Sequence, residues 1–205
     1  MLGLPRATEL SKALPKKAIF DRFKPSPTDR RLFDEQINRM SIVAEISPQT
    51  VALKASEDIS AVYVILVALK TNQCDKKNIA LLSKLIDQRM LFVLQSGENA
   101  RLAVYHAGRV LMSESTPLTD RKLNLSGLDL EAVWENAIAQ IGGIDLTGGK
   151  ALNATIAEND RQEKLTKQIM ALEKKAMTER QARRKWELAE EIRRLKIELG
   201  ETANV

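Results

Sequence analysis

The chain has 205 residues, of which 44% are hydrophobic and 29% are charged, and its formal net charge is +5. This length and composition are typical of one compact domain with an appendage, and they exclude a wholly disordered chain. One cysteine excludes a disulfide scaffold. No apolar run approaches the roughly 20 residues that cross a bilayer, and the N-terminus lacks the apolar stretch of a signal peptide. We therefore expect a cytoplasmic protein with no membrane contact.

Residues 1–26 predict a basic arm with two short helices, over 8–13 and 16–23. A Ser-Pro pair then begins a helix expected over 27–39, because serine caps a helix and proline suits its first turn. Residues 1–31 contain eight Lys or Arg against three Asp or Glu, so much of the basic excess lies in this part of the chain.

Three β-branched runs follow and predict strands at 42–46, 51–53 and 61–69. The nine apolar residues of the third run indicate a central strand covered on both faces. A helical period over 76–88 and an apolar run at 90–94 complete an αβββαβ order.

A hairpin over 100–114 and an amphipathic helix over 128–141 complete the body. The expected fold class is therefore α+β, with a mixed sheet built on an αβββαβ core over 27–143 and a C-terminal hairpin and helix. A glycine-rich linker is expected over 144–152, because the spacing of its glycines and lysine does not match a phosphate-binding loop.

Residues 153–199 contain no glycine or proline and predict one long, coiled-coil-like helix, followed by a tail over 200–205. Two apolar stripes have coiled-coil spacing: Leu165, Ile169 and Leu172, and then Leu188, Ile192, Leu195 and Leu199. On a continuous helix these stripes would lie about 140° apart. Either the distal half meets another chain, or the helix folds back near 178–185. Trp186 beside the second stripe is a candidate interface anchor.

A single histidine and a single cysteine exclude a His/Cys metal cluster, and we expect no cofactor or metal. The αβββαβ order is also the core of the restriction-endonuclease-like fold, in which Lys70 would act beside a metal held by carboxylates. The available carboxylates are Glu45 and Asp58, whereas Ala68 stands where that pattern has an acid. The corresponding hypothesis is a degenerate or divergent nuclease.

Two basic clusters form a second candidate site, because nucleic acids are bound where several cations converge on one surface. The candidate DNA- or RNA-binding residues are Lys16, Lys17, Arg22, Lys24, Arg30, Arg31, Arg183, Arg184 and Lys185. The alternative is that both clusters are solvated faces.

A further set of features lies in the segments 4–10, 14–17, 47–50, 62–70 and 91–94. Through these segments, residues 1 to about 150 resemble an uncharacterised bacterial domain family, one of the domains of unknown function. Members of the family that it resembles tend to lie beside genes for DNA methyltransferases and superfamily-two helicases, as in restriction-like phage-defence loci. Relatives often have an acid at the position of Ala68. The resemblance implies a DNA-linked assembly, with a methyltransferase or helicase complex as partner.

The leading hypothesis is a non-catalytic accessory subunit. Its body would dock on a large DNA-modifying or DNA-translocating partner, and its C-terminal helix would bind that partner or a second copy of the chain.

Overall fold

The computed structural model describes residues 2–56, 58–145 and 151–200, and the chain divides into two compact units after residue 145. Most of the expected linker, 146–150, and most of the expected tail, 201–205, lie outside the described residues. No helix in the described part of the chain is long and apolar enough to span a membrane.

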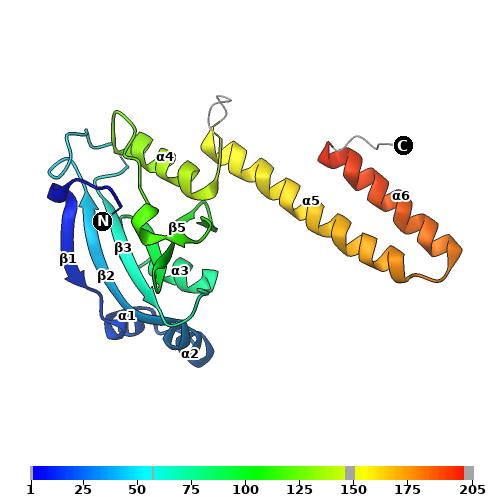
Figure 1. Ribbon diagram of the computed structural model, residues 1–205, viewed down its shortest axis with the longest axis horizontal. Helices are drawn as coiled ribbons and strands as arrows, with labels where there is room; N and C mark the ends of the chain where they lie inside the picture. Colours follow the sequence, from blue (N-terminus) through cyan, green and yellow to red (C-terminus); the bar gives the residue numbers. More distant parts are fainter. Residues whose placement is uncertain (1, 57, 146–150, 201–205) are drawn as a thin grey trace. The chain divides into compact units, whose positions relative to one another are not determined.

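A mixed sheet forms the centre of the first unit (Figure 1). Its strands are β1 (Glu9–Ala13), β2 (Ile37–Ile46), β3 (Val62–Leu69), β4 (Arg89–Ser96), β5 (Asn99–His106), β6 (Arg109–Met112) and β7 (Thr116–Pro117). The strand order is β1-β2-β3-β4-β5-β6, with β7 also paired to β5. Only the β3–β4 pair is parallel among these described pairings. The expected mixed sheet and the interior position of β3 are confirmed.

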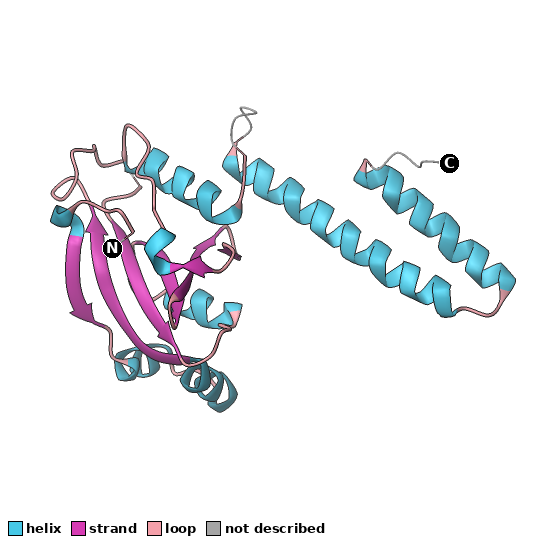
Figure 2. Ribbon diagram, in the orientation of Figure 1, coloured by secondary structure: helices cyan, strands magenta, loops and turns pink. Residues whose placement is uncertain are grey.

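Helices cover the sheet (Figure 2). The helices of this unit are η1 (Arg6–Thr8), α1 (Lys16–Phe23), α2 (Pro27–Gln36), α3 (Lys76–Leu82), η2 (Leu118–Asp120) and α4 (Leu130–Gly142). α2 begins as expected, because the Ser26 hydroxyl accepts a hydrogen bond from the Asp29 amide at 3.1 Å. It ends at Gln36 rather than at 39, and β2 starts at the next residue.

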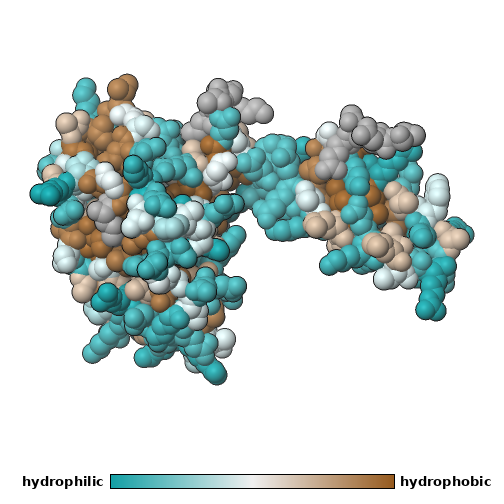
Figure 3. Space-filling model, viewed as in Figure 1, coloured by the Kyte–Doolittle hydropathy of each residue, from teal (hydrophilic) through white to brown (hydrophobic). Residues whose placement is uncertain are grey.

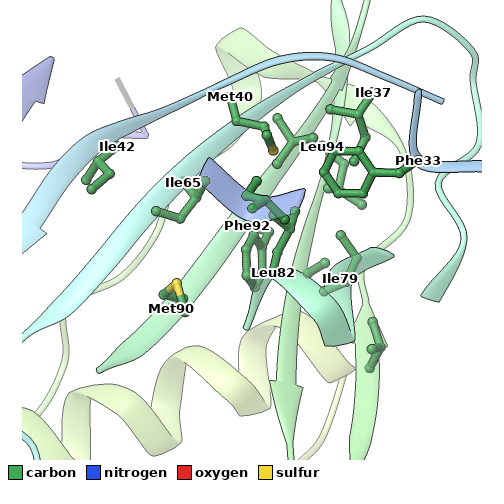
Figure 4. Close-up of a cluster of buried hydrophobic side chains, with 14 residues drawn as sticks. Phe33, Ile37, Met40, Ile42, Ile65, Ile79, Leu82, Met90, Phe92 and Leu94 are labelled. Atoms are coloured by element: carbon green, nitrogen blue, oxygen red, sulfur yellow. The ribbon is translucent and has the colours of Figure 1, made fainter. Parts of the chain in front are cut away.

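Alternate residues of β3 and β4 face one continuous hydrophobic cluster (Figure 4). Ile65 and Phe92 supply it from the sheet, Phe33 from α2, and Ile79 and Leu82 from α3. The residues of α4 lie outside this cluster, and α4 contacts β5 and β6. Each of these side chains is almost completely shielded from solvent, so burial of this cluster contributes strongly to the stability of the unit.

The helix expected over 8–13 is wrong, because residues 9–13 form β1 and pair with β2. A helix of six residues is marginal in water, whereas an open sheet edge offers backbone hydrogen-bonding groups to an extended chain. The pairing continues beyond the strand, where the Leu14 amide donates to the Met40 carbonyl at 2.9 Å. The N-terminal arm is therefore part of the α/β body, and the expected body boundary at residue 27 is corrected.

The strand expected at 51–53 is also wrong, and with it the αβββαβ order. A turn occupies this part of the chain, held by Thr50, whose hydroxyl accepts from the Ser47 amide at 2.9 Å and donates to the Glu45 carbonyl at 2.8 Å. The Val51 amide donates to the Ser47 carbonyl. Because the turn already uses these backbone groups, the three apolar residues at 51–53 do not suffice to form a strand.

The second unit contains α5 (Leu152–Thr178) and α6 (Ala182–Leu199), so the single long helix expected over 153–199 is wrong. The chain folds back between them, which is the second of the two arrangements that the apolar stripes allow. Both Glu179 and Gln181 have extended backbone angles. Gly200 ends α6 in the left-handed conformation that glycine adopts without strain.

Candidate functional site

The two apolar stripes face each other in the α5–α6 hairpin. Leu165 and Ile169 of α5 are 7% and 5% exposed. The partly buried stripe residues are Leu172, Leu188, Ile192, Leu195 and Leu199. Since α5 and α6 are in contact along the hairpin, the stripes form its seam. An ion pair between Arg161 and Glu198, at 3.5 Å, joins the same two helices.

The turn of the hairpin is held by the carboxylate of Glu179. It accepts hydrogen bonds from the amides of Gln181, at 2.9 Å, and Arg180, at 2.8 Å. These amides favour the charged form and hold the pKa of Glu179 below its ordinary value. A side chain therefore ends α5 at a place where the sequence has neither glycine nor proline.

The outer face of α6 exposes large apolar side chains. Trp186 is 68% exposed and Ile197 is 61% exposed, and neither belongs to the seam. Glu190 and Arg193 lie between them on a shallow, open surface. Figure 3 shows hydrophobic atoms interrupting the hydrophilic surface of the hairpin. Trp186 was identified from the sequence, whereas Ile197 was missed. The available signal was that Ile197 follows Trp186 by 11 residues, which is about three helical turns and places both on one face of the helix.

The candidate catalytic residues are not brought together as a nuclease site requires. Glu45 pairs with Tyr63 near the start of β3, whereas Lys70 follows the end of that strand. Lys70 is seven residue steps along the extended chain from Tyr63, a distance of about 23 Å. The Lys70 ammonium donates instead to the Asp34 carbonyl at 2.7 Å.

Asp58 lies in the loop before β3, where it lines a small cavity with Arg89 and Trp134. No three His, Cys, Asp or Glu side chains of the described residues are grouped so that they could hold a metal ion. A nuclease site in which Lys70 acts beside a metal held by Glu45 is therefore inconsistent with the structure.

Candidate nucleic-acid-binding cations of the first unit lie on α1, at its C-terminal cap and on α2, but several have partners within the protein. Lys16 pairs with Asp34 at 3.0 Å, and Arg31 pairs with Glu35 at 2.7 Å. Arg22 donates to the Leu85 carbonyl at 2.6 Å.

Arg30 lies over the ring of Phe20, with its guanidinium 4.7 Å from the ring centre. Lys17 and Lys24 are exposed on the surface. Lys16 and Arg30 therefore link α1 to α2, and Arg22 links α1 to the segment after α3. The charges of Lys16 and Arg31 are partly balanced by their carboxylate partners.

The other basic cluster lies in the second unit, at the start of α6. Arg183, Arg184 and Lys185 are exposed, and Arg183 pairs with Glu187 at 3.3 Å within the helix. The two candidate clusters thus belong to different units, and each is a local surface of its own unit.

Cys74 lies in the loop before α3 and is partly buried. Burial, with a further contribution from the Asp75 carboxylate, raises the pKa of the Cys74 thiol to about 12. Since the thiolate is the reactive form, we expect Ellman's reagent to label the native chain at pH 8 at least tenfold more slowly than the chain in urea. Equal labelling rates for the native chain and the chain in urea would contradict the burial of the Cys74 thiol.

Together these features define a mixed α/β body carrying a C-terminal helical hairpin with an exposed apolar face. The family whose sequence model matches this chain is described as Domain of unknown function (DUF4391), and the match covers residues 2–199. The chain belongs to this family, and the match extends through both units. Neither the curated proteins nor the solved structures gave a match.

Proposed function

We propose that this protein is a non-catalytic accessory subunit that assembles, through its helical hairpin, into a DNA-modifying or helicase-containing complex. The observation that carries the proposal is the exposure of Trp186 on a helix that has no fully buried residue. Exposed tryptophans beside other apolar groups are characteristic of interface centres.

Two further side chains support an assembly role for the hairpin. Met170 and Met177 of α5 are 60% and 84% exposed. Flexible methionine side chains are common on surfaces that bind protein partners. By contrast, the large apolar side chains of the body are gathered in its core, with Leu10 and Leu128 as the exposed exceptions among its described residues.

The DNA-related nature of the partner is supported by the family resemblance, since members of that family tend to lie beside methyltransferase and helicase genes. It enters the proposal as an association between genes, since a fold by itself does not define a function. The proposal therefore combines a surface observed in this chain with a class of partner inferred from relatives.

The test is to purify the full-length, affinity-tagged protein from its native host and to identify the proteins that accompany it by mass spectrometry. We expect a DNA methyltransferase or a helicase, with at least a tenfold lower yield for Trp186→Ala. Leu128→Ala is the control, because Leu128 is 90% exposed but lies in the first unit. Equal yields for Trp186→Ala and the wild type, or the absence of such an enzyme, would overturn the proposal.

A further inference from the structure

α6 carries a second stripe on the side opposite the seam. Trp186, Glu190, Arg193 and Ile197 follow each other at intervals of four, three and four residues. This is the spacing of a coiled-coil interface. The stripe begins two residues before Leu188, the first seam residue of α6, and two residues correspond to about 200° around a helix. One side of α6 therefore faces α5, and the other presents a complete stripe that α5 does not cover.

When this stripe lies against an antiparallel copy of itself, each side chain faces one that complements it. Counted from a point between residues 191 and 192, Trp186 and Ile197 are equally distant, and so are Glu190 and Arg193. In an antiparallel pair of identical helices about a twofold axis at that point, Trp186 meets Ile197 twice and Glu190 meets Arg193 twice. Isologous contacts of this kind are the commonest in homodimers.

The flanking residues fit the same arrangement. Glu187 and Arg194 lie on one border of the stripe, and the twofold axis brings the same border of both helices together. Glu187 of one chain then approaches Arg194 of the other. A parallel pair would instead place Glu190 against Glu190 and Arg193 against Arg193, which like charges disfavour.

We infer that the outer face of α6 binds a second copy of this chain in antiparallel orientation. The Trp186–Ile197 contacts supply most of the buried apolar area, while the charge pairs set orientation and register. Exposed ion pairs contribute little affinity each, so the dimer is expected to be reversible and dependent on concentration. The inference rests on the proposed function, because it specifies one partner of the hairpin.

The experiment is sedimentation equilibrium on the full-length protein over a concentration series. The average mass of the wild type should rise from 22.9 kDa toward twice that value. Each single charge reversal, Glu190→Arg or Arg193→Glu, places like charges opposite each other and should weaken dimerisation at least tenfold. Lys174→Glu, an exposed reversal on α5, is the matched control and should dimerise like the wild type.

Mixing provides the decisive comparison. An equimolar mixture of the Glu190→Arg and Arg193→Glu proteins brings opposite charges together at both positions, so a heterodimer should form near wild-type affinity. The chain carrying both reversals should recover self-association too. Circular dichroism checks that every variant keeps its helices. A wild type that stays monomeric, or single variants that weaken dimerisation without recovery on mixing, would overturn the inference.

These outcomes are separable from those of the proposed function. If the chain is monomeric but the enzyme still accompanies the wild type and is lost with Trp186→Ala, antiparallel pairing is wrong and the accessory role stands. If the chain dimerises as expected but no DNA-modifying enzyme or helicase accompanies it, the pairing is supported and the accessory role is overturned.

Discussion

Replacing Phe92 with alanine is expected to lower the free energy of unfolding of the first unit by about 3–5 kcal/mol. Phe92 is fully buried on β4, where it lies opposite Ile65 of β3 and Ala103 of β5. Its ring also belongs to the cluster that joins the sheet to α1, α2 and α3. Paired strands lie on both sides of it, so the structure can collapse only partly into the resulting cavity.

The measurement is urea unfolding followed by tryptophan fluorescence in a Trp186→Phe background, which leaves Trp134 as the emitter. Trp134 is buried in α4 and therefore reports on this unit. Leu128→Ala, at a highly exposed position, is the control and should change stability by less than about 0.5 kcal/mol. If Phe92→Ala lowers the free energy of unfolding as little as the control does, the cluster contributes little to the stability of the unit.

Long apolar runs made the centre of the body predictable from the sequence. The run over 61–69 indicated an interior strand, and β3 fills that position. The predictions were wrong at 8–13 and 51–53, where the surroundings determine the conformation of a short segment. One becomes a strand because β2 offers it an edge, and the other becomes a turn because the Thr50 hydroxyl uses nearby backbone groups.

The seam of the hairpin was predictable in its residues but not in its geometry. The seven stripe residues were identified from their spacing, and the angle between the stripes already allowed a fold-back. The turn itself was hidden, because Glu179 forms it with its own carboxylate in a segment of good helix formers. The outer stripe was missed because Glu190 and Arg193 stand between Trp186 and Ile197, so the stripe lacks the continuous apolar pattern of a coiled-coil seam.

Replacing Ile169 with aspartate is expected to unfold the α5–α6 hairpin while the α/β body stays folded. Ile169 is 5% exposed in the seam, so the substitution places a carboxylate among apolar side chains with a cost of several kcal/mol. A hairpin of two helices with a partly buried seam has little stability to offset such a cost. Since the two units are separately compact, the loss should be confined to the second.

Hydrogen exchange measured by mass spectrometry separates the two units directly. For Ile169→Asp, peptides from α6 and the distal part of α5 should lose protection, while peptides from β3 and β4 should exchange as in the wild type. Met170→Asp is the matched control, because the neighbouring residue is 60% exposed and its carboxylate remains in water. If the hairpin is equally protected from hydrogen exchange in Ile169→Asp and Met170→Asp, the burial of Ile169 in the seam is contradicted. If protection is lost in β3 and β4 as well, the body depends on the hairpin, and the family domain is one folding unit rather than a body with an independent assembly element.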